Sequence, residues 1–141
     1  MFTVHHLNNS RSQRVLWLLE ELGQPYEIEH YQRDSVTNLA PPALLAKHPL
    51  GKSPMLEVDG RIITESGAIV DYLCAGFGPQ LVPARATDAY ITHLELMHFA
   101  EGSAMTPILL QLYVGKLGEA GAPLAPRIAQ QLQSHFAYME S

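Results

Sequence analysis

The stretch from Asn8 to Ser12 places hydroxyl and amide side chains just before a predicted helix. The first turn of a helix leaves backbone N–H groups unpaired and carries a partial positive charge, so it stabilises an anion nearby. A hydroxyl group held at the same place can donate to that anion. The stretch therefore indicates a site for a negatively charged atom. Its polar residues Asn8, Asn9, Ser10 and Ser12 are equally typical of plain helix N-caps, and both interpretations stay open at this point.

The elements that position this stretch are a strand, a helix and a second strand. Residues 3–7 and 26–31 are β-prone, and residues 11–22 carry an apolar stripe with helical spacing. Gly23 is placed as a C-terminal cap. The stripe consists of Val15, Leu18, Leu19 and Leu22. Strand, helix and strand in this order predict a right-handed crossover and a parallel strand pair.

The following residues predict a hairpin and a further helix. Asp59-Gly60 separates two β-prone runs, 55–58 and 61–64, and favours a type I′ turn. A short helical turn over 41–47 precedes the hairpin, and a helix over 66–74 follows it. We expect the buried side of this helix to hold Ile69, Tyr72 and Leu73. The hairpin joins the first two strands in one sheet only if the first strand is central.

Composition limits the functional class. The chain has 141 residues, of which 47% are apolar and 16% charged, and it contains no run of 18 apolar residues, so we expect no membrane span. Its N-terminus lacks the features of a signal peptide. The net charge is −5 and the basic residues are scattered, which argues against a nucleic-acid partner.

Cysteine and histidine usage indicates neither a disulfide nor a metal site. Cys74 is the only cysteine, which fits a reducing, cytoplasmic location, and its apolar surroundings predict a packed side chain rather than a nucleophile. His5 and His6 are neighbours in a strand and face opposite sides, so they do not converge on one ion.

A change in composition after residue 76 predicts two domains. Residues 77–86 are rich in glycine and proline and form a linker between a domain over 1–76 and a helical domain over 87–141. The helical part begins with one long helix over 87–113, or two helices divided at Pro107. A turn over 115–126 precedes a last amphipathic helix marked by Ile128, Leu132, Phe136 and Met139.

Three motifs together resemble the glutathione S-transferase superfamily. They are SRSQRVLWLLEELG, HPLGKSPMLEVDG and ITESGAIVDYL, in register within residues 3–75. The resemblance is closest to bacterial and fungal members with a serine near the first helix. It implies an α/β thioredoxin-like N-terminal domain of order β-α-β-α-β-β-α, followed by an all-α C-terminal domain. That helical domain is expected to be incomplete, because about half its usual length is present.

The resemblance also implies which residues bind glutathione. Ser53-Pro54 matches the position of a cis-proline that turns the Ser53 backbone toward the cysteinyl part of glutathione, although an ordinary trans proline at the start of a strand fits the sequence as well. Glu65 and Ser66 match an acidic-hydroxyl pair that holds the γ-glutamyl end, and Ser66 is also a candidate N-cap. Lys52 matches a basic position facing the glycyl carboxylate, although it also fits a solvated loop lysine. Arg11 is expected to add positive potential.

Ser10 is the expected catalytic residue. It lies four residues before Arg14, the spacing of the catalytic serine in serine-type members. A thiol with a pKa of roughly 8.5 is mostly protonated at neutral pH. A donated hydroxyl and a helix N-terminus would both favour the thiolate, and lowering the pKa by about two units requires about 2.7 kcal/mol. Asn9 and Ser12 are rivals, because a shift of one or two residues would exchange them.

The function implied is conjugation of the glutathione thiolate to a small electrophile, by a cytoplasmic homodimer that uses glutathione as co-substrate and no metal. The residues Met97, His98 and Phe99 would face the electrophile, or belong to the helical core. One alternative is a non-catalytic protein-interaction module of the same fold, favoured by the shortened helical domain. Another is a glutathione-dependent disulfide reductase. A glutaredoxin-like mechanism is disfavoured because no cysteine occupies the first helical turn.

Overall fold

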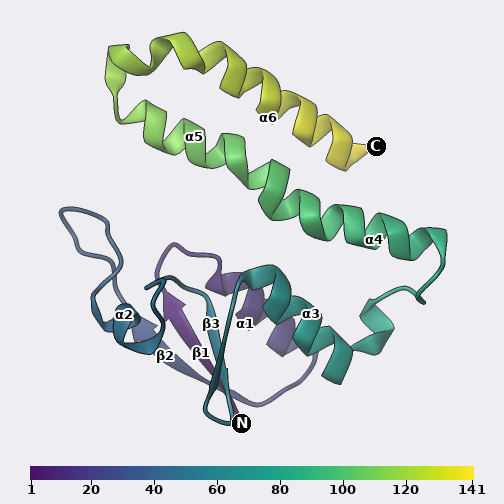
Figure 1. Ribbon diagram of the computed structural model, residues 1–141. Coiled ribbons are helices and arrows are strands. Elements are labelled where there is room, and N and C mark those ends of the chain that lie inside the picture. Colours follow the sequence, from purple (N-terminus) through teal and green to yellow (C-terminus); the bar gives the residue numbers. More distant parts are fainter. The chain divides into compact units, whose positions relative to one another are not determined.

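A computed structural model describes all residues 1–141, and the chain divides into two compact units, Met1–Val82 and Pro83–Ser141. Unit 1 contains the sheet and unit 2 is helical (Figure 1). No helix in the structure is both long enough and apolar enough to cross a membrane.

Unit 1 contains four strands and three helices in the predicted order. They are β1 Phe2–Leu7, α1 Ser12–Glu21, β2 Tyr26–Tyr31, α2 Ala43–Lys47, β3 Met55–Val58, β4 Arg61–Thr64 and α3 Ser66–Phe77, followed by a 3₁₀ turn, Pro79–Leu81. The sheet order is β2-β1-β3-β4, in which β1 is parallel to β2 and antiparallel to β3. The prediction that β1 is internal to a single mixed sheet is therefore confirmed, and so is the thioredoxin-like arrangement.

Alternating side chains of β1 enter two different cores. On one face, Phe2 and Val4 pack with residues of α1 and α3. On the other face, Leu7 packs with Leu44 of α2 and with Tyr31 of β2. Helices thus cover both faces of the sheet, and the carboxyl end of β1 leads directly into the turn before α1.

Two turns predicted from local sequence are present. Gly23 has φ +60, and Gln24 N–H donates to the Leu19 carbonyl at 3.0 Å, which is a Schellman ending of α1. Asp59 and Gly60 have φ 49 and φ 80, as a type I′ turn requires. Local backbone chemistry sets both turns, which is why the sequence predicts them.

Two local expectations are wrong. Tyr72 is 40% exposed, because the buried stripe of α3 passes through Ser66, Ile69, Leu73 and Cys74 and leaves Tyr72 beside it. The N-cap residue of α1 is Arg11, and no side chain caps the helix in the expected way. Ser10 Oγ instead accepts the N–H of Ser12, the first residue of the helix, at 3.2 Å.

Unit 2 consists of helices with few buried side chains. Its elements are α4 Asp88–Phe99, a π turn Ala100–Ala104, α5 Met105–Gly115, a 3₁₀ segment Gly118–Leu124 and α6 Ala125–Glu140. The long helix is divided at the π turn rather than at Pro107 itself. The turn lies just before Pro107, which lacks the N–H that would bond to the carbonyl of Ser103 four residues earlier, and the Ser103 carbonyl instead accepts another backbone N–H at the end of the turn.

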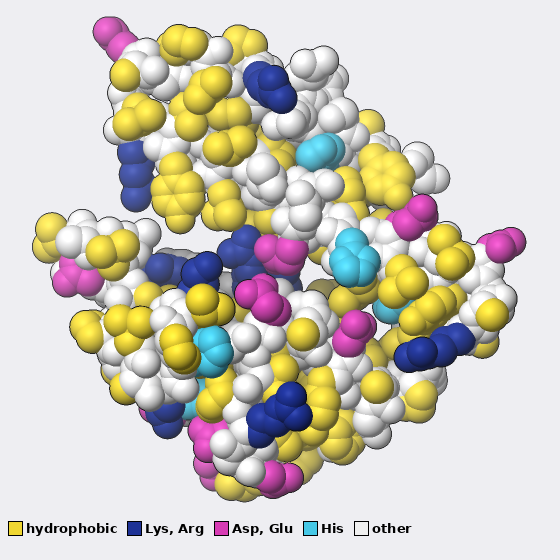
Figure 2. Space-filling model, viewed as in Figure 1, with side chains coloured by type: hydrophobic (Ala, Val, Ile, Leu, Met, Phe, Trp, Pro, Cys, Tyr) yellow, Lys and Arg dark blue, Asp and Glu magenta, His cyan; other side chains and the backbone are white.

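The apolar stripe of α6 is only partly buried. Ile128 is buried, but Phe136 and Met139 are each 51% exposed. Figure 2 shows many apolar side chains on the surface of this helical part of the chain. The amphipathic pattern therefore predicted the α6 helix correctly, and the apolar side chains of its second half lie at the surface.

Candidate functional site

Ser10 lies in the turn between β1 and α1, among a cluster of hydroxyl groups. Its Oγ is 2.7 Å from Ser12 Oγ and 3.3 Å from Ser53 Oγ. The side chain of Ser10 is half-buried, whereas Ser12 is fully buried. Of the two hydroxyl groups at the start of α1, Ser10 is therefore the more exposed.

Ser53 approaches this cluster from the loop before β3. The Ser53–Pro54 peptide bond is cis, as the matched motif implied. Ser53 Oγ donates to the His5 carbonyl at 2.8 Å and accepts the N–H of Leu7 at 3.3 Å. These bonds fix the loop against the end of β1, so that two residues 43 positions apart, Ser10 and Ser53, become neighbours.

Glu65 and Ser66 reach the same end of the sheet through strand register. Met55 pairs with Thr64, so Pro54 and Glu65 flank the same end of the β3–β4 ladder. Glu65 has φ 67, a conformation that costs a non-glycine residue of order 1–3 kcal/mol. Such backbone strain is found most often at ligand-binding and catalytic sites.

Ser66 is held by α1 and does not cap α3. Arg14 Nη1 donates to Ser66 Oγ at 3.2 Å, and Ser66 is 5% exposed. The N-cap residue is Glu65, without a side-chain cap hydrogen bond, so the expectation that Ser66 caps the helix is wrong. Ser66 is the first residue of the helix, one position too late to serve as its N-cap.

The remaining candidates lie at the margins of this region. Lys52 is exposed and directly precedes Ser53, and Arg11 is part-buried at the start of α1. Of the two rivals of Ser10, Ser12 is fully buried and Asn9 is exposed with φ 51. Burial leaves Ser12 no surface with which to contact a ligand atom.

His6 is a neighbour of the site that sequence reasoning missed. Ser12 Oγ lies 2.8 Å from His6 Nδ1, and the His6 ring packs edge-on against His30 at 5.6 Å between centroids. Burial, and then the charge of His30, lower the pKa of His6. His6 is therefore neutral at neutral pH. The alternation of β1 was the available signal, because it points His6 toward α1.

Arg33 holds the turn that precedes Ser10. The backbone N–H of Arg33 donates to Asn8 Oδ1 at 2.8 Å, and its side-chain Nε donates to the Asn8 carbonyl at 3.1 Å. Its Nη2 donates to the Asn9 carbonyl at 3.4 Å. Asn8 is thus a structural residue of this turn rather than a cap of α1.

A charged network lies on the opposite face of the sheet. Buried His5 contacts Tyr31 Oη at 3.0 Å and Glu57 at 3.3 Å, and Tyr31 donates to Glu29 at 2.6 Å. Lys47 lies 3.2 Å from Glu29. The hydrogen bond from Tyr31 lowers the pKa of Glu29, while burial and Glu29 raise the pKa of Tyr31. The network ties α2 and β2 to β1, and no group of three potential metal ligands occurs in the structure.

Cys74 is packed in α3, as expected. It is 6% exposed, and burial followed by the charge of Asp71 raises the pKa of its thiol. A thiol with a raised pKa is a poor nucleophile at neutral pH.

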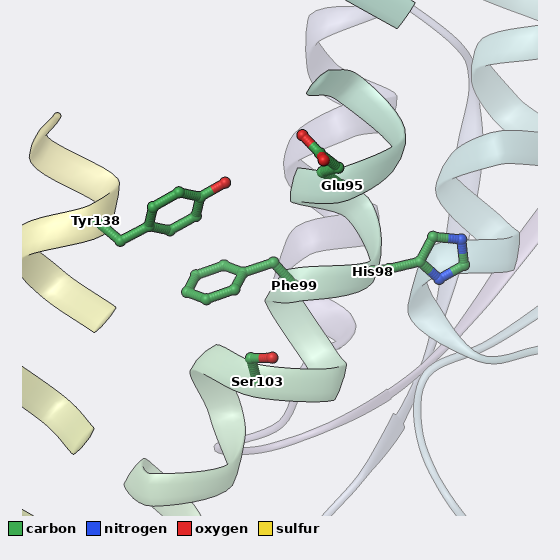
Figure 3. A pocket seen from close by; sticks show the side chains of 5 residues that line it. All are labelled: Glu95, His98, Phe99, Ser103 and Tyr138. Atoms are coloured by element: carbon green, nitrogen blue, oxygen red, sulfur yellow. The ribbon is translucent and has the colours of Figure 1, made fainter. Parts of the chain in front are cut away.

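Unit 2 contains an open pocket of ≈ 490 Å³ of its own (Figure 3). Phe99 packs against Tyr138 of α6 at 5.0 Å and against His135 at 5.4 Å between ring centroids. The pocket is lined by Glu95, His98, Phe99, Ser103 and Tyr138. The close-up shows Tyr138 directed toward Phe99 and His98 directed away from it. Two of the three residues expected near an electrophile, His98 and Phe99, line this pocket, and Met97 does not.

Comparison with known proteins gives a consistent result. Residues 1–75 match the family model of the glutathione S-transferase N-terminal domain. The chain is similar to glutathione S-transferase 3 of Schizosaccharomyces pombe, with 47% identity over 106 residues covering 74% of this chain and 43% of that protein. It is also similar to glutathione S-transferase 1 of Saccharomyces cerevisiae, with 35% identity over 147 residues covering 95% of this chain and 62% of that protein. The chain thus spans less than two thirds of both relatives.

Solved structures show the same similarity. A glutathione S-transferase from Actinobacillus pleuropneumoniae is 34% identical with a TM-score of 0.84, and the match covers 98% of this chain and 64% of that one. A glutathione transferase family member from Pseudomonas fluorescens Pf-5, solved with bound glutathione, is 25% identical with a TM-score of 0.76 over 99% of this chain and 70% of that one.

Proposed function

Because this chain belongs to the glutathione S-transferase family, we propose that it binds glutathione at unit 1 and transfers the glutathione thiolate to a small electrophile. The proposal rests on the position of Ser10, whose Oγ lies 3.3 Å from Ser53 Oγ beside the N-terminus of α1. The single buried cysteine supports a reducing, cytoplasmic setting for this activity.

In this proposal the peptide backbone of glutathione binds along the loop before β3. The backbone N–H and C=O of Ser53 pair with the cysteinyl residue as a neighbouring strand would. Glu65 accepts from the γ-glutamyl ammonium group, while Ser66 and the N-terminus of α3 bind its carboxylate. Lys52, with Arg11 adding positive potential, attracts the glycyl carboxylate.

Ser10 then stabilises the thiolate. Its hydroxyl donates to the sulfur, and the N-terminus of α1 contributes positive potential from the same side. Together these effects lower the thiol pKa by about two units, which corresponds to about 2.7 kcal/mol. The raised pKa of Cys74 supports a mechanism in which the nucleophile comes from glutathione and not from the protein.

The aromatic pocket of unit 2 has the composition of a site for a small apolar ligand. Phe99 and Tyr138 present ring surfaces, and Glu95 and Ser103 supply polar groups at the margin. Most small-molecule sites combine apolar walls with a few polar groups in this way.

The experiment that tests this function joins calorimetry with a conjugation assay. Glutathione should bind and be consumed with a generic aryl halide. Binding without conjugation would favour the non-catalytic interaction module. Consumption only with a mixed disulfide as substrate would favour the disulfide reductase. Absence of glutathione binding would contradict the proposal.

We also propose that the chain forms a homodimer through unit 2. Ile91 is 54% exposed, and Leu94 and Met105 are only part-buried within that unit. Exposed apolar side chains of this kind are typical of interaction surfaces. Sedimentation at micromolar concentration should show a dimer, and a purely monomeric profile would contradict this part of the proposal.

A further inference from the structure

The hydroxyl of Ser10 is the first group in a series of short polar contacts that ends at His6. Ser10 Oγ is 2.7 Å from Ser12 Oγ, and Ser12 Oγ is 2.8 Å from His6 Nδ1. Each hydroxyl can either donate or accept, and Nδ1 does one or the other according to its protonation. The three groups are therefore connected by exchangeable protons.

The protons in this series of hydrogen bonds can be arranged in two directions. In the first, Ser10 donates to Ser12, which donates to an unprotonated His6 Nδ1. In the second, His6 Nδ1–H donates to Ser12, which donates to Ser10. Ser10 then accepts from both the hydroxyl and the backbone N–H of Ser12, the latter at 3.2 Å, so its own proton must point elsewhere.

Distances favour the first direction when no ligand is bound. Both hydroxyl protons then lie in the short contacts of 2.7 and 2.8 Å. In the second direction, the nearest protein acceptor for the Ser10 proton is Ser53 Oγ at 3.3 Å. A thiolate beside Ser10 reverses this preference, because a hydrogen bond to a charged acceptor is roughly twice as strong as a neutral one.

Resting on the proposed function, we infer that Ser12 and His6 relay the proton of the bound glutathione thiol away from Ser10. The S–H bond breaks and its proton goes to Ser10 Oγ. The Ser10 proton passes to Ser12, and the Ser12 proton passes to His6 Nδ1. The proton on His6 Nε2 leaves to water. The sulfur keeps its electron pair as the thiolate, and His6 is neutral before and after.

The environment of His6 suits transfer rather than storage of a proton. Burial and His30 lower the pKa of His6, so a doubly protonated ring is unfavourable and one proton is released. The ring is only part-buried, which gives that proton access to solvent. Neither Ser12 nor His6 touches glutathione, so both are positioning residues that act through Ser10.

The test is the protonation of His6 Nδ1, observed by ¹⁵N NMR of the full chain. Without ligand, Nδ1 should be unprotonated, and with saturating glutathione it should carry a proton while the ring stays neutral. S-methylglutathione has no thiol proton to give, so it should bind without changing the tautomer. This comparison uses the unmodified protein and does not depend on the folding of any variant.

Variants separate the relay from a structural role. Ser10→Ala and Ser12→Ala should each abolish the tautomer change, and Ser12→Ala should lower the conjugation rate near neutral pH about three- to tenfold. His30→Gln is the matched control, since His30 contacts the His6 ring but is not part of the hydrogen-bonded series Ser10–Ser12–His6. It should retain the tautomer change.

The outcomes distinguish this inference from the proposed function. Glutathione bound as a thiolate, with a thiol pKa that depends on Ser10 but an unchanged His6 tautomer, would overturn the relay alone. Failure of glutathione to bind, or a thiol pKa indifferent to Ser10→Ala, would overturn both. A tautomer change with glutathione and none with S-methylglutathione supports both.

Discussion

The two units of this protein differ in how they bury apolar side chains. Unit 1 packs Val4, Val15, Leu19, Leu56 and others at no exposure on both faces of its sheet. In unit 2 only Pro107, Gly121 and Ile128 are buried, and many large apolar side chains remain exposed. Unit 1 thus has a core of its own that can hold a chemical site rigidly, while unit 2 presents apolar surface suited to contacts with other molecules.

The largest expected effect tests this difference in packing. Leu19→Ala removes a fully buried side chain of α1, and it should lower the free energy of unfolding by about 2–5 kcal/mol. Leu112→Ala is the matched change in a helix of unit 2, where the side chain is 52% exposed. It should cost less than about 1 kcal/mol. Urea denaturation followed by circular dichroism measures both changes. Similar decreases in the free energy of unfolding for the two variants would contradict the proposed difference in packing between the units.

Binding provides the next test. Ser66→Ala should weaken glutathione binding by about 1–2 kcal/mol, because a charge-assisted hydrogen bond to the γ-glutamyl carboxylate is lost. Stability should change little, since Ser66 does not cap α3 and loses only the contact with Arg14. Ser134→Ala in α6, whose hydroxyl donates to the Gln131 carbonyl, is the control. Calorimetry should show its affinity unchanged, and an unchanged affinity for Ser66→Ala would remove Ser66 from the site.

The smallest expected effect is on the pH dependence of stability. The folded pKa of His6 lies below its ordinary value, so the unfolded chain binds more protons as the pH falls through about 6.5. Stability should therefore decrease over this range, and His6→Asn should remove part of the decrease. Glu29 also has a lowered pKa, so a second loss should occur below about pH 4.5 in both proteins.

Thermal unfolding at a series of pH values measures these changes. The control is His98→Asn, at an exposed position of unit 2, which should leave the profile as it is in the unmodified protein. Identical profiles for His6→Asn and the unmodified protein would contradict the assigned environment of His6.

The features that the sequence predicted correctly are those set by the backbone preferences and alternation of neighbouring residues. Gly23, Asp59 and Gly60 set their turns through their own backbone preferences, and the alternation of β1 divided its side chains between two faces. These turns and this alternation depend on a few neighbouring residues, so they can be predicted without knowledge of the fold. The cis bond at Ser53–Pro54 was implied only by the family resemblance, because the residues alone also fit a trans proline.

Contacts between distant residues were not predictable in the same way. The hydrogen bonds Arg14–Ser66 and Arg33–Asn8 join residues 52 and 25 positions apart, and each depends on strand register and on the rotation of a helix. The exposure of Tyr72 and the π turn ahead of Pro107 likewise depend on how a helix packs. His6 was considered only as a metal ligand, because its contact with Ser12 requires the fold.

The ultraviolet absorbance of the thiolate, titrated against pH, measures whether Ser10 stabilises the thiolate of bound glutathione. In Ser10→Ala, glutathione affinity should stay nearly the same, because the proposed binding contacts lie at Lys52, Ser53, Glu65 and Ser66. The pKa of the bound thiol should rise toward its free value, and the conjugation rate near neutral pH should fall about ten- to a hundredfold, with less loss at alkaline pH. Coincident titration curves for the two proteins would show that Ser10 does not stabilise the thiolate, and a shift on Asn9→Ala instead would assign the role to the neighbouring residue.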